Sequence, residues 1–473
     1  MSPDPRIARD PGSVDGRHFD VAIVGGGIYG ALCAVESAQR GLGTLLVEAA
    51  DFGAGTSFSS LRTIHGGLRY LQWLDFARAR RSARQQCWWL EQFPDLVQSR
   101  ACVMPLYGRW GRSRTAFHAA GVLARLAGMQ RLASGGRAKG PLVRLLGADE
   151  VRRRWPGIRA AGLRGGAEWR EGFMPESGRV IIECLRWAVA GGATMLNYAE
   201  LVAARPEGQG RSRLTLRDRV AGADISVSAS TVVNAAGDRV EEVARHLCGD
   251  ERRLVTPTIA WNILLDAKLP EDTCLVLAAP KSRSQAYFMQ PFHGRVLAGT
   301  GHAGLKDRQS DGMPPRESLE RMCSEIDAAY PDARLGRAPV LRILAGMLPG
   351  VGSGEVRLAV RPRIHHDVAT GGARLLHVVG VKLTEAPEVA RRTLDGVTGT
   401  IARKLPGRPS PGSGWNALDP AHPPTRESLL ALAARESVLY LDDLLERRTN
   451  AWCDAAASAK IADLMAGAFR SKA

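Results

Sequence analysis

The chain has 473 residues, which is more than one hydrophobic core usually supports, so two domains are expected. Its hydrophobic fraction of 45% and charged fraction of 24% are typical of globular proteins, and no run of about 18 apolar residues predicts a transmembrane helix. The formal net charge of +16 is compatible with binding to anionic lipid or to an anionic small substrate, and equally with an arginine-rich composition that has no binding role. The sequence has no zinc-ligand spacing, basic zipper or RNA-binding aromatic motif, which argues against binding to nucleic acid.

The first segment, residues 1–18, is rich in Pro, Asp and Gly where a secretory signal would need an apolar core. We interpret it as a short disordered tail. The 8 cysteines are scattered along the chain without a C-x-x-C pair, which argues against a metal site or a disulfide framework and favours a reducing compartment. Together these features predict a cytoplasmic protein with no metal.

A nucleotide-binding motif follows the tail. The apolar run FDVAIV predicts a strand buried on both faces, and it leads into G-x-G-x-x-G, formed by Gly25, Gly27 and Gly30. A helix then extends to Gly41, and a second apolar strand ends on Glu48. This order of strand, glycine turn, helix and acid is typical of a dinucleotide-binding unit, since the helix N-terminus favours a pyrophosphate and the acid accepts hydrogen bonds from a ribose.

The motif alone does not separate NAD from FAD. Two later segments repeat the strand-turn-helix pattern: TVVNAAGDRVEEVARHL, which turns at Ala236 and Gly237, and LLHVVGVKLTEAPEVARRTL, which turns near Gly380. These crossings predict a sheet assembled from distant pieces of the chain, with one helix N-terminus available to the anionic edge of a reduced flavin.

The segment TSFSSLRTIHGGLRYL carries a family resemblance. Its HGGLRYL, from His65 to Leu71, resembles a hallmark of the FAD-dependent glycerol-3-phosphate dehydrogenases, within the wider D-amino-acid-oxidase-like flavoproteins. The segments PESGRVIIECLRWAVAGGATMLNYAELV, NAAG, YFMQPFHGRVLAGTGH, VVGVKLT and ESVLYLDDLLERRTNAW are similar to the family in the same order. The resemblance covers about Phe19 to Phe469.

The resemblance implies an α/β fold with FAD as cofactor, oxidation of a secondary alcohol to a ketone, hydride transfer to the flavin, and quinone or another electron acceptor. Family catalytic positions fall on His65, Lys382 and Arg361. A His accepts a hydroxyl proton near neutral pH, and the two cations suit phosphate or reduced flavin. The alternatives are a structural hydrogen bond at His65 and a solvated charge at Lys382. Implied cofactor contacts are Gly25, Gly26, Gly27, Ile28, Gly30, Glu48, Thr56, Ser57, Ser59, His65, Gly66, Gly67, Val202, Ala236, Gly237, Gly346, Gly380, Lys382, Leu383 and Thr384.

Several positions depart from the family pattern. Leu348 stands where the family has an arginine that grips the substrate phosphate, and Leu cannot donate the bidentate fork. Gly301 and His302 replace a Thr-Asp pair, and Val381 replaces a second glycine. We therefore expect altered specificity, with either Arg342 or Arg363 supplying the lost charge or with a different, unphosphorylated hydroxy compound as the substrate.

A basic stretch, residues 109–140, contains apolar positions at helical spacing, including Leu126, Met129 and Leu132. It fits a helix lying at the headgroup level of a membrane, near a quinone pool, and it fits equally a helix that covers its own domain core. Peripheral contact with the inner face of the membrane is therefore one of two expectations.

The predicted fold is a Rossmann-like FAD-binding domain with an interleaved antiparallel-sheet substrate domain and a short C-terminal helical module. Two other functions remain open: an amine or amino-acid oxidase on the same scaffold, and a flavin-binding protein without dehydrogenase activity. The expected divisions are 19–95, 160–250 and 346–405 for the FAD-binding domain, 96–159 and 251–345 for the substrate or cap domain, 406–416 for a linker, and 417–471 for the helical region.

Overall fold

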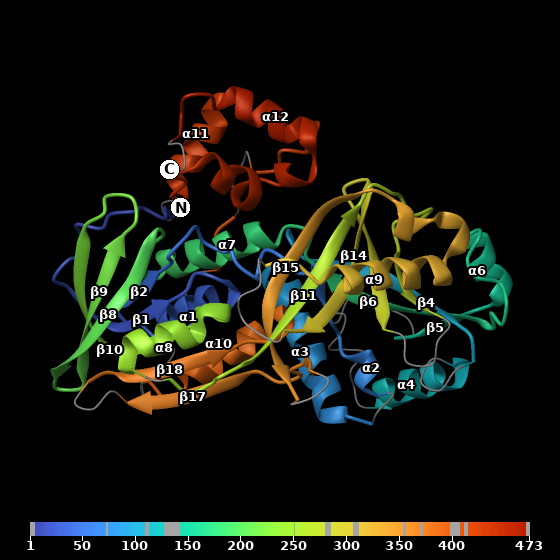
Figure 1. Cartoon of the computed structure of the whole chain (residues 1–473), viewed down its shortest axis with the longest axis horizontal. Helices are drawn as coiled ribbons and strands as arrows, with labels where there is room; N and C mark the ends of the chain where they lie inside the picture. Colours follow the sequence, from blue (N-terminus) through green and yellow to red (C-terminus); the bar gives the residue numbers. More distant parts are fainter. Residues whose placement is uncertain are drawn as a thin grey trace.

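The computed structural model describes residues 5–71, 74–108, 113–126, 142–249, 251–279, 285–305, 312–352, 356–368, 372–397, 407–410 and 415–469. Two sheets carry the fold, and a helical C-terminal part stands beside them (Figure 1). Within these ranges no helix is both long enough and apolar enough to cross a bilayer.

The first sheet has a parallel centre. Its strands run in the order β18-β10-β1-β2-β7, each parallel to its neighbour, and antiparallel strands extend it on both the β18 and the β10 side. β1 reads HFDVAIV and its last four residues are buried, which agrees with a strand covered on both faces. The bounds are β1 His18–Val24, β2 Thr44–Val47, β7 Thr194–Leu196, β8 Ala199–Gly208, β9 Arg211–Asp218, β10 Asp224–Asn234, β17 Arg363–Val368 and β18 Arg374–Val379.

Helices cover both faces of this sheet, as an α/β layer structure requires. Helix α1, which follows the glycine turn, packs against α7 and α10 on one face of the sheet. Helix α8 lies on the opposite face, where its Val243 and Leu247 join a separate apolar cluster. In Figure 1 these helices surround the blue and green strands. The bounds are α1 Ile28–Gln39, α7 Ser177–Ala190, α8 Val240–Cys248 and α10 Ala386–Leu394.

The second sheet is mostly antiparallel and runs in the order β16-β15-β11-β14-β13-β12-β4-β6-β3, with β5 beside β6. Helices α6 and α9 contribute to the core on one side, and α2, α3 and α4 to the core on the other. The strands are β3 Thr63–Ile64, β4 Gln98–Leu106, β5 Arg144–Leu146, β6 Gly165–Phe173, β11 Thr256–Leu265, β12 Cys274–Ala278, β13 Ala286–Phe292, β14 Arg295–Gly304, β15 Val340–Val351 and β16 Arg357–Leu358. The helices are α2 Leu68–Leu71, α3 Phe76–Gln92, α4 Arg114–Leu126, α6 Ala148–Arg154 and α9 Arg316–Ala329.

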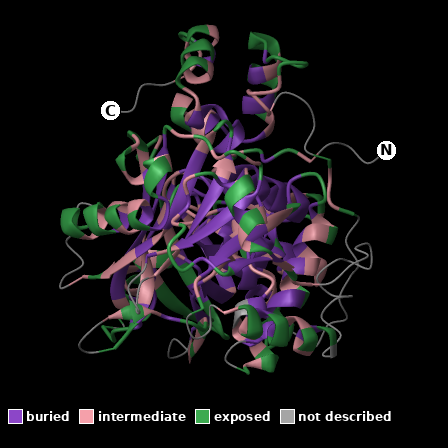
Figure 2. Cartoon of the chain, turned by 90° about the vertical axis from the view of Figure 1, so that its right-hand side faces the viewer, coloured by how far each residue is buried: buried purple, intermediate pink, exposed green. Residues whose placement is uncertain are grey.

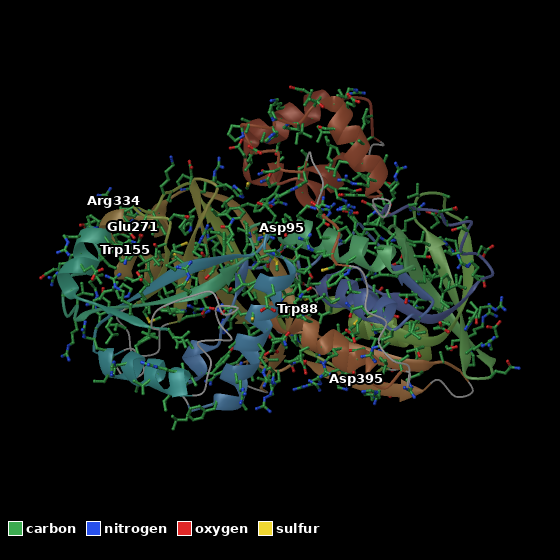
Figure 3. The ribbon with its side chains drawn as sticks, turned by 180° about the vertical axis from the view of Figure 1, so that it is seen from behind. Trp88, Asp95, Trp155, Glu271, Arg334 and Asp395 are labelled. Carbon is green, nitrogen blue, oxygen red and sulfur yellow. The ribbon has the colours of Figure 1, made fainter. Side chains whose placement is uncertain are left out.

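The outer end of the second sheet is closed by polar contacts. Arg154, at the end of α6, pairs with Glu271 at 2.7 Å and lies 4.5 Å from the ring centroid of Trp155. Figure 3 shows Trp155 and Glu271 close together beside α6, far from the C-terminal helices. The strand ends at this edge of the molecule are therefore tied to the helix that covers them.

The C-terminal part forms a small apolar core of its own around Leu429, Leu432, Leu444 and Ile461. It protrudes from the compact body, and Figure 2 shows exposed faces on these helices above the buried strands. The bounds are α11 Arg426–Arg435, the π-helix Asp443–Arg448, the 3₁₀ helix Ala451–Cys453, and α12 Ala455–Leu464.

The α/β fold class is confirmed, with a Rossmann-like sheet and an interleaved antiparallel sheet. The predicted disordered tail is wrong for residues 5–17. Ile7 is 1% exposed and donates its backbone N–H to the Arg435 carbonyl at 2.9 Å, and Arg9 pairs with Asp218 at 2.6 Å. The segment packs because it carries two apolar residues, Ile7 and Val14, that join the cores, and one cation whose partner lies more than 200 residues away.

Sheet membership also differs from the predicted segment boundaries. β6 lies in residues 160–250 and the end of β15 lies in residues 346–405, yet both strands pair within the second sheet. The predicted linker is partly packed, since Arg408 donates to the Gln92 carbonyl at 3.0 Å. Each of these strands belongs to one sheet alone, so the predicted boundaries do not coincide with the points at which the chain passes from one sheet to the other.

Candidate functional site

The glycine turn has the geometry that its sequence predicts. Gly25 has φ +110°, and a Cβ there would lie 2.5 Å from the Ala235 carbonyl oxygen. A Cβ on Gly30 would lie 1.9 Å from the Gly25 carbonyl oxygen, so α1 packs directly on the turn. Gly27 is the N-cap of α1, and the first helical N–H, of Ile28, donates to Ser57 Oγ at 3.0 Å. The turn therefore brings backbone N–H groups and the positive end of a helix dipole to one point.

Glu48 directly follows β2 and lies beside this turn. Its Oε2 accepts from the Gly26 N–H at 2.6 Å and its Oε1 from the Ala50 N–H at 2.9 Å. Burial raises the pKa of this carboxyl. The Glu48 carboxyl is thus fixed by two backbone donors at the wall of the cavity described next.

A single cavity of about 600 Å³ extends from the first sheet to the second. Glu48 and Glu200 line it from the first sheet, whereas Asn262 and Thr300 line it from the second. It brings together most of the predicted site residues. These are Gly25, Gly27, Ile28, Glu48, Thr56, Ser57, Ser59, His65, Ala236, Gly237, Gly346, Gly380, Lys382, Leu383 and Thr384.

The remaining predicted residues do not line the cavity, and their expected contacts with cofactor or substrate stay predictions. Gly26 and Gly30 pack beneath the turn, and Val202 lies next to Leu201, which does line it. Arg361 is exposed and stands outside the cavity. The family pattern placed this arginine by its neighbours in the sequence, but the chain directs it outward just before β17.

The HGG turn packs against helix α3. A Cβ on Gly66 would lie 2.6 Å from Gln86 Oε1, and one on Gly67, where φ is +85°, would lie 2.8 Å from the Ala79 carbonyl oxygen. These two glycines serve close packing, and the packing holds the backbone of His65 at the cavity wall. The His65 N–H donates to Thr384 Oγ1 at 3.2 Å, which joins this turn to the start of the 3₁₀ turn Leu383–Glu385.

Lys382 is held from two sides. Its ammonium donates to the Tyr70 hydroxyl at 2.5 Å, and its carbonyl accepts from the Tyr29 hydroxyl at 2.7 Å. Tyr29 is buried, and burial raises its pKa above the ordinary value. The tyrosine packs on the Gly380 turn, where a Cβ would lie 2.1 Å from its ring. Lys382 is therefore a cation held in place at the cavity wall, and it is not a freely solvated surface charge.

Leu348 also lines the cavity, so the departure from the family pattern lies inside the site. Neither of the two arginines proposed to supply the charge lost at Leu348 lines the cavity. Arg342 pairs with Glu446, and Arg363 is exposed at the edge strand β17.

Sequence reasoning missed three residues that belong to this region. Asn262 lines the cavity and donates to the Ser59 carbonyl at 2.8 Å. Arg62 also lines it, is 2% exposed, and stacks its guanidinium 5.1 Å from the Phe58 ring centroid. Glu171 is 4% exposed and lies behind His65. Only Glu171 had a local signal in the sequence, because the alternation of residues along its strand indicates a buried position. That alternation does not indicate that the side chain lies behind His65.

The fold and the cavity define a dinucleotide-binding oxidoreductase of the flavin type. The residues present fit FAD. The turn leaves no Cβ over the N-terminus of α1, an acid stands at the end of β2, and Gly237 has open space around it at the start of the second crossing.

Comparison with known proteins agrees with this class. The family model "FAD dependent oxidoreductase" matches residues 20–395, and the chain belongs to that family. It is an enzyme family whose cofactor is FAD.

The chain is also similar to glycerol-3-phosphate dehydrogenases of known sequence and structure. The glycerol-3-phosphate dehydrogenase of Synechocystis sp. is 29% identical over 415 residues, covering 83% of this chain and 72% of that protein. Glycerol-3-phosphate dehydrogenase 1 of Mycobacterium tuberculosis is 29% identical, covering 80% and 73%. The glycerol-3-phosphate dehydrogenase from Bacillus halodurans complexed with FAD has a TM-score of 0.64 at 20% identity, covering 95% of this chain and 79% of that one.

Proposed function

We propose that this protein oxidises a secondary alcohol to a ketone, with glycerol 3-phosphate or a related polyol or hydroxy compound as substrate and with quinone or another acceptor downstream. The observation that carries the proposal is that His65 and Lys382 line the same cavity as the glycine turn. This arrangement supports a proton acceptor and a cation beside an alcohol that meets a bound flavin. The glycerol-3-phosphate dehydrogenases among the relatives support the choice of substrate class.

His65 and Lys382 have different roles in the proposed reaction. FAD, when bound, supplies a two-electron acceptor for the hydride that leaves the carbinol carbon. His65 takes the hydroxyl proton, so that the alcohol loses one proton and one hydride and becomes a ketone. Lys382, fixed by Tyr70 and Tyr29, presents an ammonium that attracts an anionic substrate group.

The proposal is tested by anaerobic flavin bleaching. The holoenzyme is mixed with glycerol 3-phosphate, glycerol, hydroxy acids and amines, and visible absorbance is followed while the product is identified. We expect an alcohol of this set to bleach the flavin and to yield the ketone, and His65→Gln to slow bleaching by about 10²-fold or more. Faster bleaching by amines with peroxide release in air would instead show an amine oxidase, and bleaching by no compound would show a flavin protein without dehydrogenase activity.

We also propose that the protein meets an anionic membrane surface through the start of α3. Leu74, in the turn before α3, is 66% exposed, and Phe76, the first residue of α3, is 42% exposed. Arg80, Arg81 and Arg84 of the same helix are also exposed. Apolar side chains flanked by arginines suit a headgroup region, and contact with a membrane would bring a quinone within reach. We name this set the α3 basic surface.

The 109–140 stretch supports a membrane role less directly. In helix α4, Phe117, Ala120 and Ala124 are buried, so one face of this helix covers its own core. Val122, on another face, is 44% exposed. The predicted apolar edge of Met129 and Leu132 lies outside the described residues.

Flotation with vesicles of phosphatidylcholine and phosphatidylglycerol tests the α3 basic surface. Replacing its three arginines by Glu should weaken binding by about 100-fold or more, at about 1 kcal/mol for each cation near the surface. The matched control carries the same charge change at Arg205, Arg211 and Arg253, which are exposed on or near other strands. Equal loss in both variants would show an effect of net charge alone and would end the assignment to α3.

A further inference from the structure

A buried carboxylate lies directly behind His65. Glu171 lies near the end of β6 and is 4% exposed, on a strand whose register pairs Gly172 with Ile64. Its Oε2 accepts from the Gly66 N–H at 2.6 Å, and its Oε1 accepts from Trp169 Nε1 at 2.9 Å. A buried carboxylate is costly unless it is hydrogen-bonded, and these donors meet that requirement.

A third donor fixes the carboxylate from helix α3. Gln86 Nε2 lies 3.3 Å from Glu171 Oε2 and 3.0 Å from the Ile64 carbonyl oxygen. Gln86 is itself buried, so the carboxylate, the amide and the strand β3 form one connected polar group. The orientation of Glu171 is therefore set by the fold before any ligand binds.

His65 presents one ring nitrogen to this carboxylate. The distance from His65 Nδ1 to Glu171 Oε1 is 3.7 Å, and the His65 side chain is 33% exposed whereas the Glu171 side chain is 4% exposed. The ring also stands edge-on to Phe288, with centroids 5.3 Å apart. With Nδ1 turned to the buried acid, the other nitrogen, Nε2, lies on the opposite side of the ring, away from the carboxylate.

We infer that Glu171 is a positioning residue that sets the tautomer of His65, keeping the proton on Nδ1 and the lone pair on Nε2. An ionised carboxylate is an acceptor only, so it favours the ring form that carries N–H toward it. It also favours the imidazolium that forms when Nε2 takes the substrate hydroxyl proton. This role rests on the proposed function, in which His65 is the proton acceptor.

A purely structural role is the competing explanation, because Glu171 also satisfies the Gly66 and Trp169 donors. The two roles differ in what Glu171→Gln changes. Loss of packing would lower stability and leave the ring tautomer as it was. Loss of an acceptor would change the tautomer, because a Gln amide offers both a donor and an acceptor.

The first measurement is independent of turnover. ¹⁵N spectra of protein with labelled histidine, in which the His65 signals are assigned by their loss in His65→Gln, report which ring nitrogen carries the proton. We expect the Nδ1–H form in the native protein and loss of that preference in Glu171→Gln. Glu171→Asp, which keeps a carboxylate, should retain it. The control is Glu168→Gln on the same strand, where Glu168 pairs with Arg154 at 2.7 Å.

The second measurement is the rate of flavin reduction in a double-mutant cycle. We expect Glu171→Gln to slow reduction by about 10- to 100-fold, which is half, on a logarithmic scale, of what a positioned base contributes. In a His65→Gln background the same change should have little further effect, because the two residues act as a unit.

An unchanged His65 tautomer in Glu171→Gln, or the same rate loss with and without His65, would overturn the inference. If Glu171→Gln does not fold, the Glu171→Asp variant tests the inference. Retention of the Nδ1–H tautomer in Glu171→Asp supports the positioning role, and loss of that tautomer opposes it. Failure of every alcohol to reduce the native flavin would remove the proposed function, while the tautomer spectra would still decide what Glu171 does to His65.

Discussion

Asp51 and Arg448 face each other across almost the whole length of the chain. Two guanidinium nitrogens of Arg448 donate to the two carboxylate oxygens of Asp51, at 2.8 and 2.7 Å, and both side chains are fully buried. Asp51 lies three residues beyond Glu48 at the cavity, whereas Arg448 belongs to the C-terminal helical part. The pair therefore connects that part to the loop that follows Glu48 at the cavity wall.

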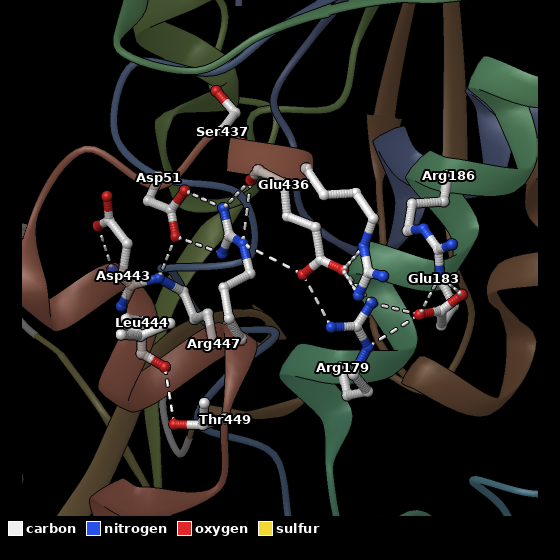
Figure 4. Close-up of polar contacts among 12 residues, drawn as sticks. Asp51, Arg179, Glu183, Arg186, Glu436, Ser437, Asp443, Leu444, Arg447 and Thr449 are labelled. Carbon is white, nitrogen blue, oxygen red and sulfur yellow. Dashed lines mark hydrogen bonds and ion pairs between the residues drawn. The ribbon is translucent and has the colours of Figure 1, made fainter. Parts of the chain in front are cut away.

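The pair belongs to a larger buried network. Arg447 also reaches Asp51, at 2.5 Å, and Arg448 donates to the Glu436 carbonyl, while Glu436 pairs with Arg179 on α7 at 2.8 Å. Figure 4 shows these groups as one row from Asp443 to Arg186. A network of this kind is satisfied only as a whole, so removing one member leaves buried charges without partners.

Asp51→Asn should therefore destabilise the protein by about 3–5 kcal/mol, the usual cost of breaking a buried ion pair. Urea unfolding measures the loss, and hydrogen exchange should show reduced protection of residues 415–469. The control is Asp463→Asn on exposed α12, for which a change of about 0.5 kcal/mol or less is expected. Equal effects of the two substitutions would contradict the assignment.

The same carboxylate predicts a dependence of stability on pH. Burial acts to raise the pKa of Asp51, but Arg448 and Arg447 outweigh it and lower the pKa from 3.8 to about 2. Because the folded-state pKa is below the unfolded value, the stabilisation is present above about pH 4 and is lost as the pH falls toward about 2. The expected size is about 2 kcal/mol.

The measurement is the difference in unfolding free energy between the native protein and Asp51→Asn at several pH values from 5 downward. That difference should shrink as the pH falls below about 4, because Asp51 of the unfolded chain then becomes protonated, whereas Asp51 of the folded protein keeps its charge until the pH approaches about 2. A difference that stays constant through this range would show that Asp51 is not the titrating group.

The glycine turn gives a prediction on cofactor retention. Gly30→Ala would put a Cβ 1.9 Å from the Gly25 carbonyl oxygen, and neither backbone can yield without moving the turn. We expect the purified variant to lose the flavin or to misfold, with no visible absorbance after reconstitution with excess FAD. Gly147→Ala, where no atom lies within 4 Å of the added Cβ, should retain the flavin as the native protein does.

How much the sequence could predict depends on the range of the interaction. The turn from Gly25 to Gly30 and the acid Glu48 were predictable because one strand, one turn and one helix create them. The grouping of His65 with Lys382 followed from the family resemblance. Both conclusions concern residues whose geometry is set by nearby chain or by an established pattern.

The unpredicted features depend on pairing across the chain. Glu171 reaches His65 through strand register, the N-terminal segment packs through Ile7 and Arg9, and Arg361 turns outward although its motif neighbours enter the cavity. Hydrophobic periodicity describes which face of an element is buried, and it does not state which partner lies against that face.

Leu348 offers a gain-of-function test of specificity. Leu348→Arg would place a guanidinium on the cavity wall where the family pattern has one, and a charged hydrogen bond to phosphate contributes about 1.5–3 kcal/mol. We expect the ratio of kcat/KM for glycerol 3-phosphate to that for glycerol to rise by about 10- to 100-fold. Leu348→Met, which keeps the size and adds no charge, should leave the ratio unchanged. If native protein already reduces its flavin with glycerol 3-phosphate at saturating rates and the arginine adds nothing, another cation binds the phosphate, and altered specificity is refuted.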